Sequence, residues 1–174
     1  IETLKAGTSN ATTFTVDQGD LAAGGSVVGG AGSDTLAAGG TLVDLTSTTL
    51  SSVETLKAAT NGATSFIVDQ ADLFAGGSVI GGAAGGDSIT INGTSLDLTS
   101  TTTSSIEILK AGTSGATTFT VDQADLAAKG SVIGGGANDT LIVSGASVDL
   151  SSTTLSSVEI LQASGTNARS EEHT

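Results

Sequence analysis

The chain has 174 residues, 25 of them glycine, and contains no proline, cysteine, methionine, tryptophan or tyrosine. Its 18 acidic and 5 basic residues give a formal net charge of −13, which argues against binding to nucleic acid or to anionic membrane surfaces and makes cations the natural partners. Without cysteine there can be no disulfide, thiolate metal site or cysteine nucleophile. Four phenylalanines are the only aromatic residues, so any core must be thin and aliphatic, as in solenoids.

A unit of 52 or 53 residues is repeated along the chain. Its clearest markers are Phe14, Phe66 and Phe119, and each copy opens with a glutamate at Glu2, Glu54, Glu107 or Glu159. We divide the chain into copies at 1–53, 54–106 and 107–158, the start of a fourth at 159–161, and a non-repeat tail at 162–174.

A shorter spacing of 26 or 27 residues lies inside each copy. A hydroxyl residue followed by a β-branched residue keeps this spacing at Ser26-Val27, Ser52-Val53, Ser78-Val79, Ser105-Ile106, Ser131-Val132 and Ser157-Val158. An aspartate after an apolar residue keeps a similar spacing at Asp17, Asp44, Asp69, Asp97, Asp122 and Asp149. We interpret about 26 residues as one coil of a repeating structure.

In chain order, the residues of each copy predict short strands separated by turns. T-T-F-T-V (12–16) alternates in the manner of a strand. The segment D-Q-G-D-L-A-A-G-G (17–25) instead predicts one helical turn, with Asp17 as N-cap and Asp20 three residues later. D-T-L-I-V (139–143) and S-V-E-I-L (157–161) again predict strands. The predicted fold is an all-β parallel β-solenoid of about six coils, with a short helical turn in alternate coils.

The six aspartates that keep the shorter spacing would form one column if the coils stack in register. Carboxylates about 4.8 Å apart repel one another, so a buried column would need cations or hydrogen-bond donors. Two interpretations stay open: each aspartate ends a strand and accepts backbone N–H bonds in the next turn, or the column shares calcium ions.

Three glycine-rich turns contain a second set of aspartates, Asp34, Asp87 and Asp139. The first turn, G-G-A-G-S-D-T-L-A (29–37), fits the calcium-binding nonapeptide G-G-x-G-x-D-x-U-x. Glycine lets backbone carbonyls converge and aspartate adds charge, which suits a hard cation. The turns of the alternate coils, such as K-A-G-T-S-N-A-T (5–12), carry no acid. Each turn is therefore either a possible calcium site with few carboxylates or a plain tight turn.

Two further patterns bear on function. Glutamate and lysine recur together at Glu2/Lys5, Glu54/Lys57 and Glu107/Lys110, a pattern that predicts stacked, structural charge pairs. Threonines on alternate residues, at Thr13/Thr15 and Thr118/Thr120, could form hydroxyl ladders, which favours an ice-binding or carbohydrate-binding solenoid as the alternative function. No nucleophile motif or phosphate-binding loop is present, and His173 is the only histidine. The sequence therefore predicts no enzymatic activity and no cofactor other than possible calcium.

The motifs G-G-x-G-x-D-T-L, S-V-E-x-L and V-D-L-S-S-T-x-L together resemble repeats of large bacterial exoproteins, including RTX-like adhesins, S-layer proteins and other type I secretion substrates. The resemblance covers residues 1–161. It implies export to the extracellular space or cell surface, a calcium-rich environment, and a structural role as spacer, stalk, or lattice or filament element. Calcium ligands carry over only to Asp34, Asp87 and Asp139. We also expect the rod to self-associate end to end, and no membrane insertion.

Overall fold

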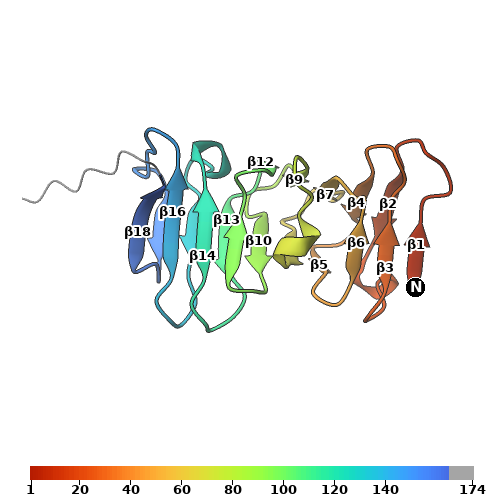
Figure 1. Cartoon of the computed structure of the whole chain (residues 1–174), viewed down its shortest axis with the longest axis horizontal. Helices are drawn as coiled ribbons and strands as arrows, with labels where there is room; N and C mark the ends of the chain where they lie inside the picture. The colour runs from red at the N-terminus through yellow and green to blue at the C-terminus, as the bar shows by residue number, and fades with distance from the viewer. Residues whose placement is uncertain (165–174) are drawn as a thin grey trace, which may run out of the picture.

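The computed structural model describes residues 1–164, which form a rod of stacked coils with the described ends at opposite ends of its long axis (Figure 1). Every strand pair is parallel, and each strand pairs with strands of the coil before or after it. The prediction of a parallel β-solenoid is confirmed, with about seven turns. No helix in residues 1–164 is long and apolar enough to cross a membrane.

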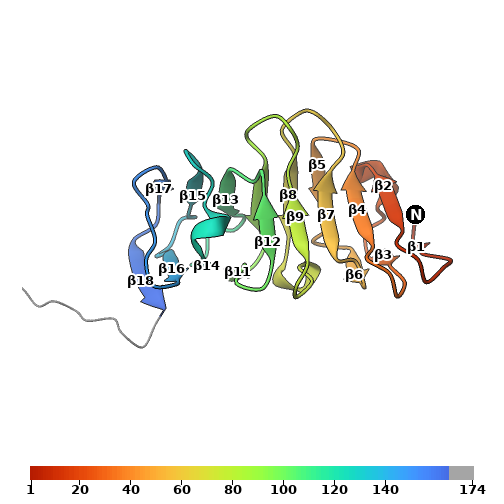
Figure 2. The same ribbon diagram turned by 90° about the horizontal axis from the view of Figure 1, so that it is seen from above.

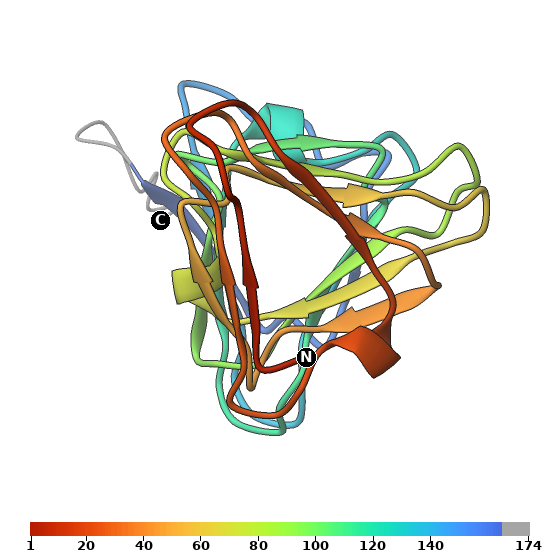
Figure 3. The ribbon, with the colours of Figure 1, turned by 90° about the vertical axis from the view of Figure 1, so that its right-hand side faces the viewer.

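Viewed along its axis, the rod has a triangular outline with three faces (Figure 3). Face 1 contains β1 (Thr3–Lys5), β3 (Ser26–Val28), β6 (Thr49–Ser51), β11 (Ser95–Asp97), β14 (Thr118–Val121), β16 (Thr140–Ser144) and β18 (Ile160–Ser164). Face 2 contains β2 (Thr13–Val16), β4 (Thr35–Ala38), β7 (Thr55–Ala58), β9 (Ser78–Ile80) and β12 (Thr102–Ser104). Face 3 contains β5 (Leu42–Asp44), β8 (Ser65–Val68), β10 (Ser88–Ile91), β13 (Ile108–Ala111), β15 (Ser131–Ile133) and β17 (Thr154–Ser156).

Three short 3₁₀ helices replace a strand at one position each. They are η1 (Gln18–Asp20) next to β5 on face 3, η2 (Gln70–Asp72) between β6 and β11 on face 1, and η3 (Gln123–Asp125) next to β12 on face 2. Each begins at the predicted N-cap aspartate, and each has a capping box formed with the aspartate three residues later. The predicted helical turns therefore form, but on three different faces (Figures 2 and 3).

The predicted coil length of about 26 residues is wrong, because paired residues are only 20 to 24 positions apart. Thr35 pairs with Thr55, Thr3 pairs with Ser26, and Ser78 pairs with Thr102. The Ser-Val dyads do not form one column either. Three of them lie in β3, β9 and β15, which belong to different faces, and the other three lie in turns where Ser52, Ser105 and Ser157 have positive φ. The spacing of 26 or 27 residues thus relates Ser-Val dyads in strands to Ser-Val dyads in turns, and these segments are not structurally equivalent.

The repeat and the coil have different lengths. Each of the first two repeats supplies six strands and one 3₁₀ helix, and each of these seven segments spans one face. The third repeat has five strands and η3, and the segment around Asp149, which is hydrogen-bonded to Gln123, takes the place of the sixth strand. Since a turn uses three faces, one repeat makes two and one-third turns, and the next repeat starts one face further around. Three repeats make seven whole turns, so β1, which begins the first repeat, and β18, which begins the fourth, both lie on face 1. Gln162 and Ser164, which we placed in the non-repeat tail, pair in β18 with β16.

The core is a single, mainly aliphatic cluster along the axis, built from the inward-facing residues of all three faces and including Phe66 and Phe119. On face 3 the inward residues in successive coils are Val43, Phe66, Ile89, Leu109 and Val132, and none is more than 2% exposed. Outward residues alternate with them, as the period of two in a strand requires. Each coil therefore buries its apolar residues only against the coils on either side.

We expect the two-and-one-third-turn repeat to control which insertions the fold accepts. Duplicating residues 54–106 inserts one complete repeat, so melting should stay cooperative and the rod should lengthen by about 11 Å, at about 4.8 Å per coil. Residues 54–79 contain β7, β8, η2 and only the first two residues of β9. Duplicating them would therefore interrupt β9 and place the following segments out of register with the neighbouring coil, so the melting temperature should fall. Circular dichroism and small-angle X-ray scattering measure both. Equal tolerance of the two insertions would contradict the expectation that only whole repeats of two and one-third turns fit the fold.

Candidate functional site: buried aspartates between the coils

Asp34 lies in the first glycine-rich turn, between β3 and β4, and its side chain is fully buried. Oδ1 accepts a hydrogen bond from the Thr12 N–H of the preceding coil (2.7 Å), and Oδ2 accepts one from the Gly30 N–H of its own turn (2.6 Å). Both carboxylate oxygens thus have a donor, which a buried charge requires. The side chain joins two coils at one corner of the rod.

The same arrangement recurs once in each of the other two repeats. Asp87 accepts from Thr64 N–H at 2.7 Å and from Gly82 N–H at 2.9 Å. Asp139 accepts at 2.7 Å from both Thr117 N–H and Gly135 N–H. Because each repeat starts one face further around, the three sites lie at three different corners and not above one another.

A glutamate of the following coil completes each site, a role that we did not predict from the sequence. The Asp34 N–H donates to Oε2 of Glu54 (2.7 Å), and the Asp34 carbonyl accepts from the N–H groups of Glu54 and Thr55 (3.0 Å each). Glu107 and Glu159 accept from the Asp87 and Asp139 N–H groups at 3.0 and 2.8 Å. Each aspartate therefore links three successive coils.

This geometry changes the interpretation of the Glu-Lys recurrence. Glu54 and Glu107 use their carboxylates on the backbone of the preceding coil, whereas Lys57 and Lys110 extend from the exposed side of β7 and β13. The signal that could have identified the glutamates is their constant spacing of 20 residues from the buried aspartates, in all three copies.

The glycines of the motif allow coils to approach closely. A Cβ on Gly29 would lie 1.7 Å from the carbonyl oxygen of Ser52 in the next coil, and one on Gly30 would lie 2.4 Å from that of Thr8 in the previous coil. Ser52 itself has a φ of 51°. The first two glycines of the turn are therefore required by contact with neighbouring coils, whether or not a metal is bound.

No group of three or more histidine, cysteine, aspartate or glutamate side chains in residues 1–164 is arranged to hold a metal ion. At Asp34, Asp87 and Asp139 a calcium ion would have to share carboxylate oxygens with the backbone donors described above. The acids nearest along the axis are the glutamates, one per site, so the structure places two carboxylates at each corner. Calcium binding at these aspartates stays a prediction.

The six aspartates expected to form one column lie at more than one corner. Asp44 is paired with Ile67 on face 3, whereas Asp97 is paired with Thr120 on face 1. All six accept backbone N–H bonds in the turn that follows. Asp17, Asp69 and Asp122 cap the 3₁₀ helices, and Asp44, Asp97 and Asp149 accept from Thr46, Thr99 and Ser151. This is the role of strand-ending turn residues, and a column of shared calcium along all six does not form.

The glutamine that follows each capping aspartate makes two hydrogen bonds to the next coil at a position where the 3₁₀ helix stands in place of a strand. The side-chain amide of Gln18 donates to the Asp44 carbonyl, and its oxygen accepts from the Asp44 N–H. Gln70 and Gln123 make the same two bonds with Asp97 and Asp149. The glutamine thus continues the hydrogen-bonded ladder across the 3₁₀ helix, which explains why it occurs in every copy.

The 3₁₀ helices also contain buried acids. Asp72 and Asp125 are 5% and 4% exposed. Burial raises the pKa of Asp72 to about 7, the charges of Asp69 and Asp44 add to this, and the hydrogen bond from Asp69 N–H opposes it. Burial likewise raises the pKa of Asp125 to about 6, against the hydrogen bond from Asp122 N–H.

The threonine pairs proposed as hydroxyl ladders lie on different faces. Thr13 and Thr15 belong to β2 on face 2, and Thr118 and Thr120 to β14 on face 1, so these pairs do not stack on one another. Face 2 does carry one continuous hydroxyl row, formed in register by Thr13, Thr35, Thr55, Ser78 and Thr102. The adjacent outward row is mixed, with Thr15, Ala37, Lys57, Ile80 and Ser104.

No protein-family model, curated protein or solved structure matches this chain.

We predict that Asp87→Asn destabilises the rod by about 2–4 kcal/mol, since the amide loses a charged acceptor and presents a donor to one of two backbone N–H groups. Asp97→Asn is the matched control. Its carboxylate is exposed and serves only the local turn, so its cost should be less than about 1 kcal/mol. Urea unfolding measures both. Equal destabilisation would mean that the buried position has no special role.

Thermal unfolding curves, recorded with millimolar calcium and with chelator, test the calcium prediction. Bound calcium raises the melting temperature of the native chain by several degrees, and Asp87→Asn reduces that rise. Superimposable curves would remove calcium from Asp34, Asp87 and Asp139.

The rod should be more stable at pH 5 than at pH 8. Asp72 has a folded pKa of about 7 against an ordinary value of 3.8, so folding favours its protonated form. Its contribution is complete below the ordinary value and is lost as pH rises through 7. Asp72→Asn keeps an acceptor but cannot ionise, so it should narrow the difference in melting temperature between the two pH values. Asp20→Asn is the control, because Asp20 has the equivalent capping position in η1 but is only half-buried. The change in melting temperature that it causes measures the loss of the capping carboxylate alone. A native chain that is more stable at pH 8 would contradict the prediction.

Proposed function

We propose that this chain is a non-enzymatic structural module, a rigid spacer, stalk or lattice element. The observation that supports the proposal is that three repeats make seven whole turns, so the rod begins and ends on the same face. Further repeats can extend it without change of cross-section. In each repeat the chemically distinctive side chains, the buried Asp-Glu pair and the glutamine that follows each capping aspartate, hold one coil to the next.

The same proposal places the rod in a secreted or cell-surface protein. Support comes from the resemblance of its G-G-x-G-x-D-T-L and S-V-E-x-L motifs to repeats of RTX-like adhesins and S-layer proteins. A chain with net charge −13, no cysteine and a fold built from contacts between neighbouring coils is suited to export in the unfolded state and folding outside the cell. Extracellular calcium would then add to a rod already joined by backbone bonds.

Association of rods end to end follows from the free edges of the described coils. Within residues 1–164, β1 pairs only with β3, and β18 pairs only with β16. Leu155, Ile160 and Leu161 are exposed at the β18 end, and Ile1 at the other. Because β1 and β18 lie on the same face, a second copy can pair its β1 with β18 in the parallel direction used throughout the chain.

Sedimentation velocity over increasing concentration tests this assembly. The native chain should form oligomers, whereas Leu161→Lys places a charge in the stacking surface and should keep it monomeric. Phe74→Lys is the control, because Phe74 is also an exposed large apolar residue (45%, against 57% for Leu161) but lies on the side of the rod, after η2. A native chain that stays monomeric at high concentration, or an equal effect of both variants, would contradict end-to-end assembly.

A further inference from the structure

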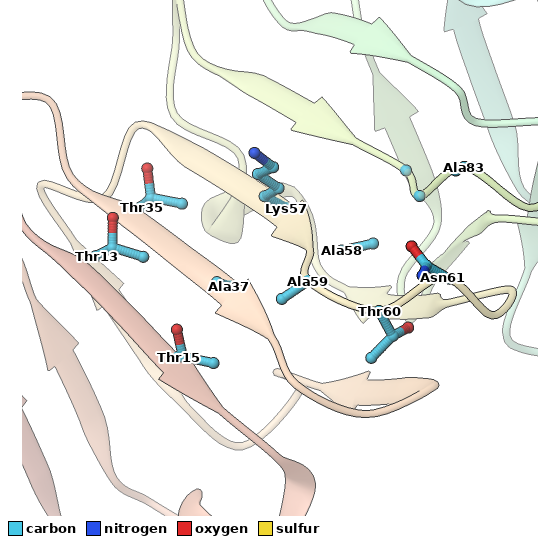
Figure 4. Close-up of a pocket in the computed structure, with 12 residues that line it drawn as sticks. Thr13, Thr15, Thr35, Ala37, Lys57, Ala58, Ala59, Thr60, Asn61 and Ala83 are labelled. Carbon is cyan, nitrogen blue, oxygen red and sulfur yellow. The ribbon is translucent and has the colours of Figure 1, made fainter.

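A groove of about 510 Å³ lies on face 2, over the outer side of β2, β4 and β7 (Figure 4). Its floor contains Thr13, Thr15, Thr35 and Ala37. Its wall comes from a change in turn length, since residues 39–41 connect β4 to β5 whereas residues 59–64 and 81–87 form longer turns in the next two coils. The groove is the step between short-turn coils and long-turn coils.

The second repeat has the same change in turn length, at residues 92–94 and 112–117, and the side chains at these positions differ between the copies. At the position of Ala37, the second repeat has Thr90 and the third has Ile142; at that of Thr15, they have Ile67 and Thr120. The smallest outward side chains therefore occur together only in the first copy. Ala37 leaves room where an isoleucine such as Ile142 would fill it, so the first copy has an open floor at this position.

The groove is lined by hydrogen-bonding groups and by one cation. Thr13, Thr15 and Thr35 carry hydroxyls on the outer side of the sheet, Asn61 lies on the turn after β7, and Lys57 extends from β7 beside them (Figure 4). The chain has only five lysine and arginine residues against 18 acids. A positive charge beside a row of hydroxyls is thus a local exception on this surface.

We propose that the groove binds a short acidic saccharide, with the carboxylate of a sugar acid on Lys57 and its hydroxyls on the threonine row and Asn61. The volume is within the range of about 300–1,000 Å³ that is typical of small-ligand sites. An apolar ligand would leave the hydroxyls without partners, and a long polyanion would be repelled by the net charge of −13. Without aromatic rings for stacking, recognition depends on hydrogen bonds and on this one charge.

Titration of the ¹⁵N-labelled chain with trigalacturonate, followed by two-dimensional NMR, tests the proposal. We expect saturable shifts confined to residues of β2, β4, β7 and the turns 59–64 and 81–87, with a dissociation constant in the millimolar range. Lys57→Gln should weaken binding about fivefold, as for loss of one exposed ion pair. Ala37→Ile, which introduces the residue of the third repeat, should abolish the shifts by filling the floor.

Matched controls separate the groove from general attraction to lysine. Lys110→Gln changes the equivalent lysine of the third copy, which lies beside Thr90 and near Ile67 of the second copy, and should leave binding unchanged. The methyl ester of the same saccharide should bind several-fold more weakly. Absence of saturable shifts, equal effects of the two lysine variants, or equal binding of the ester would each overturn the proposal. Lys57→Gln is a surface change, so the test does not depend on the folding of Ala37→Ile.

Discussion

The rod depends on how one coil is held to the next at its corners. Along the faces, parallel strands supply backbone hydrogen bonds, but the turns between faces have no ladder of their own. The buried carboxylate of the Gly-Asp turn supplies one, because it binds an N–H of the preceding coil while its own N–H binds a glutamate of the next. These charged acceptors satisfy turn backbone that would otherwise be buried without partners. The glutamine amides do the same across the 3₁₀ helices.

The second constraint is the ratio between repeat and coil. A repeat of two and one-third turns distributes equivalent segments over three faces, so the buried aspartates and the 3₁₀ helices are each placed one face further around in successive repeats. Like charges are thereby kept apart along the axis. In a rod with 18 acids and five bases, this separation reduces the repulsion that a single column of carboxylates would create.

The sequence was sufficient to predict the fold class, because alternating apolar residues, glycine-rich turns and repetition all favour a parallel solenoid. It was also sufficient to predict the capping aspartates, since the spacing of Asp17 and Asp20 is a local signal. The coil length could not be predicted in the same way. It depends on which segments pair across coils, and Ser26-Val27 and Ser52-Val53 look alike in sequence although one is a strand and the other a turn with positive φ. Glu54 was found as a repeated residue, but its partner Asp34 lies in another coil, and only the correct register brings them together.

The repeat of two and one-third turns also explains how a repetitive rod can carry a groove whose set of side chains occurs in one copy only. Each face is assembled from segments that are not equivalent, so Thr13, Ala37 and Lys57, from three kinds of strand, become neighbours on face 2. The corresponding segments of the next repeat meet on face 3, with Ser65, Thr90 and Lys110 in their places. Differences between copies in the outward residues therefore change one face at a time, while the equivalent inward positions stay apolar, as at Ala38 and Ile91. A structural rod of this kind can acquire a groove by substitution of outward residues alone. The core constrains the inward residues of the strands and the corner carboxylates constrain the turns, so the outward residues of the strands are free to change.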